Sequence, residues 1–203
     1  MKEVRFPVFE RQRKLVLSAN QVVYTLILGA LLLLHLAKNY EAGERVEKAG
    51  KYIFFAGSAL GVFFMIKQWS VRKTLMGRFN GTIVFSEGSI VVHEKEYPLH
   101  QIEKMEFSVR DYEDKVEYSS RGDFNPRRSN GTGNYCKLKL TSGETVKVYF
   151  QLLYEGEFSK MRNVLTAYYL DKKISLLKLT EYLGIEEYED IQRFKKTLPP
   201  TIV

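Results

Sequence analysis

The chain has 203 residues, a formal net charge of +7 and a sequence pI near 9.3. Residues 1–76 carry 12 basic and 5 acidic side chains and account for the whole excess, whereas residues 77–203 carry 19 of each. A nucleic-acid-binding module concentrates its basic excess on a folded domain, so this distribution excludes nucleic acid as an expected partner. The single cysteine, Cys136, excludes an intramolecular disulfide and suits a cytoplasmic domain.

Two apolar runs near the N-terminus, 22–37 and 52–66, predict a transmembrane helical hairpin. A helix needs about 20 mainly apolar residues to cross a bilayer, and the spans can extend over about residues 15–37 and 51–69. The stretch 26–34 would be apolar all round, whereas a helix in a soluble core normally keeps a polar stripe. Two buried core helices or a cleaved signal peptide are the alternatives, and the first run is too long for a signal peptide.

Basic residues beside the predicted spans set the expected orientation. Five Lys or Arg residues precede the first span, four follow the second, and four lie in the loop between them. The positive-inside rule then places both termini in the cytoplasm. The sequence therefore predicts a multi-pass protein of the plasma membrane, in contact with the lipid bilayer through a basic anchor.

From about residue 77 the hydrophobic pattern changes to that of short strands and then of amphipathic helices. Strands are expected at 82–85, 89–93, 102–109, 116–120, 135–140 and 146–152, and helices at 157–169, 175–183 and 186–198. Ser175 is the expected N-cap of the second helix, and Gly184 closes it. The predicted organisation is a basic segment with the membrane hairpin (1–76), a β domain with a capping helix (77–170) and short C-terminal helices (171–203).

The stretch 81–107 contains a short hairpin followed by YPLHQIEKM at residues 97–105. It resembles the opening strands of bacterial pleckstrin-homology-like (PH-like) domains, including the membrane-anchored YcxB-like group, and the resemblance extends over roughly residues 15–170. It implies an α+β fold on a bacterial inner-membrane anchor, with a partly open antiparallel β-barrel capped by a C-terminal helix. It also implies binding rather than catalysis. The first hairpin turn, 86–88, is too short to present the phosphate cradle of phosphoinositide-binding members.

A polar segment at 119–134 is longer than a hairpin connection requires, and such loops are often functional or mobile. Arginine side chains there could bind a carboxylate or phosphate, and residues with positive φ could supply backbone amides. The candidate ligand-binding or partner-binding residues are Arg121, Arg127, Arg128, Asn130, Gly131 and Asn134. A solvated flexible loop is the alternative.

Small residues in the second apolar run form a GxxxG pattern at Gly57 and Gly61. Small residues let helix backbones approach closely in lipid, so this pattern predicts packing against the first span at Gly29 or against a second copy of the chain.

The sequence contains no catalytic motif, no metal-ligand spacing and no cofactor-binding loop. We therefore expect a membrane-tethered, non-catalytic binding or scaffolding protein. Its cytoplasmic domain would engage a protein partner, a second copy of itself or a membrane-proximal ligand, through an exposed sheet edge or the loop 121–134. The alternative is a small structural subunit of a transport or secretion complex that acts through its transmembrane hairpin.

Overall fold

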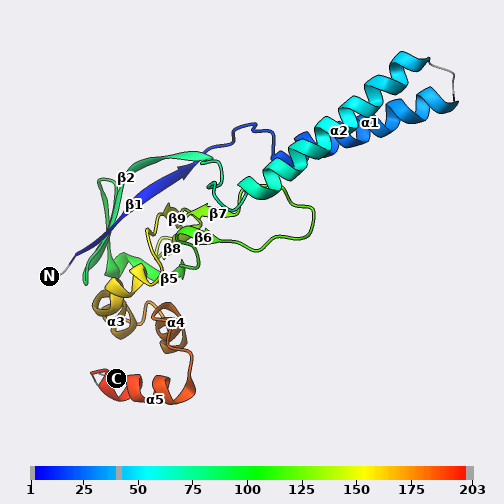
Figure 1. Cartoon of the computed structure of the whole chain (residues 1–203). Coiled ribbons are helices and arrows are strands. Elements are labelled where there is room, and N and C mark those ends of the chain that lie inside the picture. Colours follow the sequence, from blue (N-terminus) through cyan, green and yellow to red (C-terminus); the bar gives the residue numbers. More distant parts are fainter. Residues whose placement is uncertain (1–2, 40–42, 200–203) are drawn as a thin grey trace. The chain divides into compact units, whose positions relative to one another are not determined.

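The computed structural model describes residues 3–39 and 43–199 and shows an α+β protein (Figure 1). The chain divides into two compact units. The first unit comprises residues 1–12, 75–114 and 130–203, and the second comprises 13–74 and 115–129. Residues 1–2, 40–42 and 200–203, which belong to the segments 1–76 and 171–203 predicted from the sequence, lie outside the described residues.

The first unit contains a seven-stranded antiparallel sheet in the order β4-β3-β2-β1-β9-β8-β5. Its strands are β1 (Val4–Arg11), β2 (Gly77–Phe85), β3 (Ser89–Val92), β4 (Lys95–Pro98), β5 (Ile102–Ser108), β8 (Asn134–Leu140) and β9 (Thr145–Phe150), with a short 3-10 helix η1 (Leu99–Gln101) between β4 and β5. The two end strands do not pair with each other within the described residues. The strands therefore form an open sheet, and no closed barrel is present in this part of the chain.

β1 is an inner strand of this sheet that was not predicted, because its residues also read as a basic flank of the membrane span. Val4, Phe6 and Val8 are buried, and β1 pairs with β2 on one side and with β9 on the other. β1 precedes the two apolar helices and β2 follows them. The helical hairpin is therefore an insertion into the loop of a β-hairpin.

The close approach of β1 and β2 requires a glycine at the start of β2. A Cβ atom built on Gly77 would lie 2.2 Å from the carbonyl oxygen of Glu10 and 2.5 Å from the ring of Phe9. The ladder continues beyond this point, since the amide of Gln12 donates to the carbonyl oxygen of Met76 at 2.9 Å. The residues that lead into and out of the helical insertion are therefore held side by side.

The predicted strand at 116–120 is misplaced. Residues Glu113–Val116 form β6, which pairs with β7 (Arg128–Asn130) as a separate two-stranded ribbon. From Glu117 onward the chain belongs to a segment that packs against the helices of the second unit, so it does not continue the strand.

The core of the first unit is a cluster of aromatic rings between the sheet and the helices that follow it. The C-terminal helical elements are η2 (Glu157–Met161, a 3-10 turn), α3 (Arg162–Leu170), α4 (Leu176–Tyr182) and α5 (Tyr188–Thr197). The ring centroid of Phe6 lies 5.3 Å from that of Phe150 and 6.0 Å from that of Phe158. Tyr168 of α3 is fully buried, and its hydroxyl donates to the carbonyl oxygen of Ser86 at 2.8 Å. These contacts attach η2 and α3 to the inner face of the sheet.

The predicted ends of α4 are confirmed. The Ser175 hydroxyl accepts a hydrogen bond from the amide of Lys178, and Gly184 follows the helix with a φ of 67°. This is the conformation in which a glycine terminates a helix at no steric cost.

The second unit contains α1 (Ala19–Asn39) and α2 (Glu44–Lys67), which pack against each other. Both helices are long and apolar enough to cross a membrane. Only 11% of the most apolar 18-residue window of α1 and 17% of that of α2 is buried.

Substitution of Phe6 tests whether β1 is part of the core. Phe6 is 1% exposed, so we expect Phe6→Ala to lower the free energy of unfolding by about 3–5 kcal/mol. The measurement is thermal unfolding of the full chain in detergent, followed by near- and far-ultraviolet circular dichroism. Arg5→Ala is the matched control, because the neighbouring Arg5 side chain is 67% exposed. Equal losses in the two variants would contradict the core position of β1.

The inserted hairpin should be removable if β1 is kept. Replacing residues 13–75 by Asn-Gly joins Gln12 to Met76 through a two-residue turn that suits a β-hairpin. We expect a soluble protein with a strand-rich circular dichroism spectrum. Deleting residues 1–76 instead removes β1 as well, and we expect that variant to aggregate. Equal solubility of the two variants would show that the sheet does not need β1.

Candidate functional site

The polar connection between β6 and β7 is packed against the helices of the second unit. Residues 115–129, named here the docked segment, belong to the same compact unit as α1 and α2. Its contacts lie at the first turns of α1, at Gly61 within α2 and at the residues that follow α2. The solvated-loop alternative therefore does not describe this part of the chain.

Asn20 in the first turn of α1 is the main polar partner of the docked segment. Its side-chain oxygen accepts from the amide of Phe124 at 2.7 Å, and its nitrogen donates to Asp123 at 3.0 Å. The side-chain oxygen of Asn125 in turn accepts from the amide of Ala19 at 3.1 Å. The segment thus satisfies one of the backbone amides that a helix leaves unpaired at its N-terminus.

Phe124 fills the space between the two helices. Its ring lies 3.4 Å from a Cβ atom built on Gly61 of α2 and forms an edge contact with Tyr24 of α1, at a centroid distance of 5.7 Å. The Tyr24 hydroxyl donates to the carbonyl oxygen of Gly122 at 2.8 Å. Gly61 therefore makes room for an aromatic ring from the docked segment.

Arg127 contacts the residues that follow α2. Its amide donates to the carbonyl oxygen of Gln68 and its Nε to the side-chain oxygen of Gln68, both at 2.9 Å. Its guanidinium lies over the ring of Trp69, 4.3 Å from the centroid. This predicted ligand-binding arginine is therefore engaged within the chain.

The other two predicted arginines differ in environment. Arg121 is exposed near the tip of the docked segment. Arg128 lies at the start of β7. Its backbone forms an isolated parallel β-bridge with Arg72, and its carbonyl oxygen accepts a hydrogen bond from the amide of Lys73.

The remaining predicted loop residues hold a turn in the first unit. Asn134 is fully buried, and its side chain donates to the carbonyl oxygens of Asp111 and Gly131 and accepts from the amide of Asp111. Gly131 has a φ of 68°, and a Cβ there would lie 2.1 Å from the carbonyl oxygen of Leu152. The carbonyl oxygen of Asn130 accepts from the side chain of Gln151. The polar groups of these three residues therefore serve the fold.

The glycines of the predicted packing pattern have different positions. A Cβ on Gly57 would lie 3.1 Å from Leu26, and one on Gly61 would lie 3.3 Å from Val23, so both glycines face α1. Gly29 has no atom within 4 Å of a built Cβ. The contact between the helices is therefore made beside Gly29 and not at it.

Asp123 is held in its ionised form. Partial burial raises the pKa of this carboxyl group, but hydrogen bonds from Asn125 and Asn20 outweigh it, so the pKa falls below the ordinary value of 3.8. A carboxylate with a lowered pKa contributes stability above the unfolded-state value and loses that contribution as the pH falls through the folded-state value. The Asp123 carboxylate therefore makes its full contribution to the stability of the docked segment at neutral pH.

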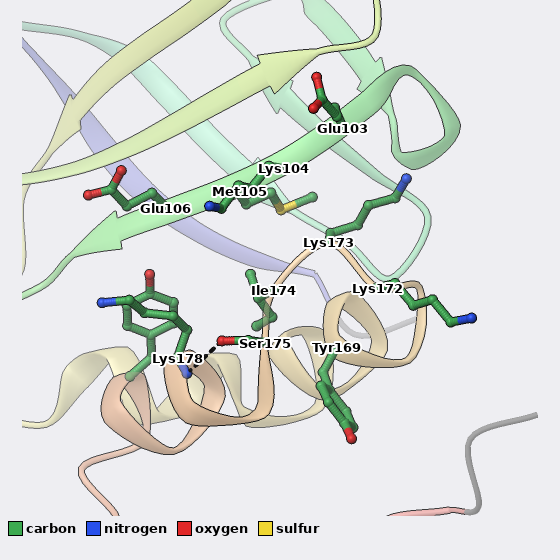
Figure 2. Close-up of a pocket in the computed structure, with 11 residues that line it drawn as sticks. Glu103, Lys104, Met105, Glu106, Tyr169, Lys172, Lys173, Ile174, Ser175 and Lys178 are labelled. Atoms are coloured by element: carbon green, nitrogen blue, oxygen red, sulfur yellow. Dashed lines mark hydrogen bonds between the residues drawn. The ribbon is translucent and has the colours of Figure 1, made fainter. Parts of the chain in front are cut away.

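A groove in the first unit lies beside β5, the end strand of the sheet (Figure 2). It has a volume of about 850 Å³. Figure 2 shows Met105 and Ile174 pointing toward each other between the strand and the helices, with lysine and glutamate side chains around them. The charged lining residues are Glu103, Lys104, Glu106, Lys172, Lys173 and Lys178.

Structural contacts occupy the walls of this groove. The amide of Met105 donates to the carbonyl oxygen of Lys173 at 3.1 Å, and the amide of Phe107 donates to the Tyr182 hydroxyl at 3.0 Å. Lys178 hydrogen-bonds Glu181, which raises the pKa of the lysine, so it stays a cation near neutral pH. Burial raises the pKa of Tyr182 in the same wall, so its hydroxyl stays protonated near neutral pH.

Both ends of the sheet are protected against pairing with another strand. The contacts to Met105 and Phe107 cover outward-facing amides of β5. β4 at the other end has only four residues, is charged at Lys95 and Glu96, and ends in Pro98. Short, charged and proline-containing edge strands resist strand addition. A partner is therefore more readily accommodated on a face of the sheet than at its edges.

The described residues include neither a cluster of metal-binding side chains nor a reactive thiol. They include no group of three or more His, Cys, Asp or Glu side chains that could hold a metal ion. Cys136 is fully buried, and burial raises its pKa well above the usual range, which keeps the thiol protonated and unreactive.

Comparison of the sequence with protein-family models found no matching family, and comparisons with curated proteins and with solved structures likewise found no match.

The side chain of Asn20 is expected to hold the docked segment in place. Asn20→Ala removes two hydrogen bonds, each worth about 1 kcal/mol, so the amide of Phe124 should exchange its hydrogen about 10- to 30-fold faster. Hydrogen–deuterium exchange of the full chain in detergent measures this. Thr25→Ala, an exposed substitution in the same part of α1, should leave the exchange unchanged. Unchanged exchange in Asn20→Ala would show that the segment is held by other contacts.

Proposed function

We propose that this protein is a membrane-anchored, non-catalytic binding protein, in which α1 and α2 cross a bilayer and carry the α+β unit on its cytoplasmic side. The single observation that supports it best is the exposure of large apolar side chains along both helices. In a soluble core these side chains would be covered by protein, and in a bilayer they are covered by lipid.

The exposed surface matches the dimensions of a membrane. The 21 residues of α1 span about 31 Å and the 24 residues of α2 about 36 Å, compared with about 30 Å for a hydrocarbon core. Apolar side chains on both helices are more than half exposed. They include Leu28 (63%), Leu32 (58%), Phe55 (69%), Val62 (57%) and Ile66 (71%).

Pairing of β1 with β2 supports a two-span topology. Arg11 of β1 lies opposite Gly77 of β2, so the chain enters and leaves the helical insertion at one place in the sheet. A hairpin that crosses a bilayer twice meets this condition, whereas a single crossing would separate the two strands. Basic residues on both flanks of the hairpin favour the cytoplasm for that side.

We extend the proposal to a PH-like domain because of the order of its strands and helices. Seven antiparallel strands are followed by η2 and α3, whose side chains pack on the inner face of the sheet. The sequence resemblance implies a partly open β-barrel capped by a helix, and the observed open sheet shares the antiparallel strands and the covering helix of that expectation, but not the barrel. It supports a role in binding a protein partner or a membrane-proximal ligand.

Membrane fractionation tests the anchor. We expect the full chain to remain in the pellet after washing with alkaline carbonate and to be released by detergent. The measurement is an immunoblot of both fractions, with a known peripheral protein as the control. Release of this protein by the carbonate wash would refute the proposal.

Labelling with a membrane-impermeant maleimide tests the topology. Glu44→Cys lies at the start of α2 and Ser142→Cys in the exposed turn between β8 and β9, and the buried Cys136 should not react. In intact cells we expect label only on Glu44→Cys, and on Ser142→Cys only after permeabilisation. The reverse pattern would place the α+β unit outside the cell.

A further inference from the structure

The outward face of the β5, β8 and β9 sheet gathers cations around two tyrosine rings. Strand register places Tyr135 opposite Tyr149, and Lys137 opposite Lys147. Lys104 lies opposite Lys139 in the neighbouring pair of strands. The basic face is defined here as Arg11, Lys104, Lys137, Lys139, Lys147, Tyr135 and Tyr149.

Like charges directly opposite each other destabilise a sheet, so the two lysine pairs require nearby groups that offset their repulsion. The two tyrosine rings supply part of this stabilisation. The amino group of Lys147 lies 3.8 Å from the centroid of Tyr135, and the guanidinium of Arg11 lies 3.8 Å from that of Tyr149. A hydrogen bond from Lys147, together with the charge of Arg11, lowers the pKa of Tyr149.

Few acids offset these cations. Within the described residues, Glu103 pairs with Lys139 at 2.8 Å, and Glu106 lies opposite Lys137 in the register. Residues 77–203 carry no net charge, so this concentration of lysine reflects position on one face and not the composition of the domain. The excess positive charge is therefore available to an external anion.

The form of the face argues against a small-molecule pocket. The hollow between Lys104, Lys137, Lys139 and Thr145 has a volume of about 240 Å³. Sites for drug-sized molecules occupy roughly 300–1,000 Å³ and bury most of the ligand. The basic face therefore suits a broad, flat partner.

The residue types of the basic face distinguish between a protein surface and a membrane surface as its broad, flat partner. Lysine is depleted at the centres of protein–protein interfaces, whereas clusters of lysine near a membrane are attracted to anionic headgroups. Four of the five cations are lysines, which act as point charges and lack the planar fork with which arginine recognises individual phosphates. Arg11 also precedes Ala19, the first residue of α1, by only eight positions.

We propose that the basic face binds the anionic headgroups of the bilayer in which α1 and α2 are anchored. This inference rests on the membrane anchor proposed above. The interaction needs no specific headgroup, because diffuse attraction between basic residues and anionic lipid supplies the affinity.

Depth-dependent quenching in nanodiscs tests the proposal with the full chain. A fluorophore is attached to Thr145→Cys on the basic face, to Glu87→Cys in the turn between β2 and β3 as the matched exposed control, or to Phe55→Cys in α2. The buried Cys136 does not compete for the label. The nanodiscs contain phosphatidylcholine with increasing phosphatidylglycerol and a fixed fraction of quencher lipid.

We expect quenching at Thr145→Cys to rise with the phosphatidylglycerol fraction and to fall at high salt, and quenching at Glu87→Cys to stay low. Combining Lys104→Gln, Lys137→Gln and Lys147→Gln should weaken this association about 100-fold. Quenching at Thr145→Cys that does not depend on anionic lipid would overturn the inference. Strong quenching at Phe55→Cys in the same nanodiscs would show that the anchor nevertheless holds, and its absence would refute the anchor itself.

Other partners give a different result. If polyglutamate or an RNA oligomer changes the fluorescence at Thr145→Cys, and phosphatidylglycerol does not, the basic face binds that polyanion and the lipid proposal is wrong.

Discussion

The pairing of β1 with β2 is the constraint on which the rest of the structure depends. The two strands lie on opposite sides of the helical hairpin in the sequence, yet they form a ladder, with one register shift between Pro7 and Phe9, that ends at Gln12 and Met76. Closing so long a loop costs entropy, which grows only slowly with loop length. The compact pairing of α1 with α2 shortens the effective loop, so the hairpin itself brings the two strands together.

The same constraint explains the aromatic core. Phe6 enters the core only because β1 is paired on both sides, and its ring meets those of Phe85, Phe150 and Phe158. Phe158 belongs to η2, so the helices after the sheet pack on side chains that come from before the hairpin. Residues from both ends of the chain therefore determine whether the α+β unit is stable.

Local patterns were sufficient to predict the two apolar helices, most strands and the Ser175 cap, because each depends on residues close in sequence. They could not establish β1, although Val4, Phe6 and Val8 show the alternation of a strand, since its neighbours come from residues 77–85 and 145–150. The docked segment was missed for a similar reason. Asn20 and Tyr24 are polar side chains near the start of the first apolar run, and their partners lie about a hundred residues away in the sequence.

The docked segment also limits how the hairpin can associate with other helices. Phe124 lies against Gly61, and α1 lies against Gly57, so the small residues that usually allow close helix packing in lipid are covered within the chain. A second copy that used this face would first have to displace Phe124 and break the hydrogen bonds of Asn20. Association through the surface at Gly29 requires no such displacement, because no atom lies within 4 Å of a Cβ built on Gly29. Any assembly through the hairpin is therefore more easily built on the α1 surface that contains Gly29 than on the GxxxG pattern of α2.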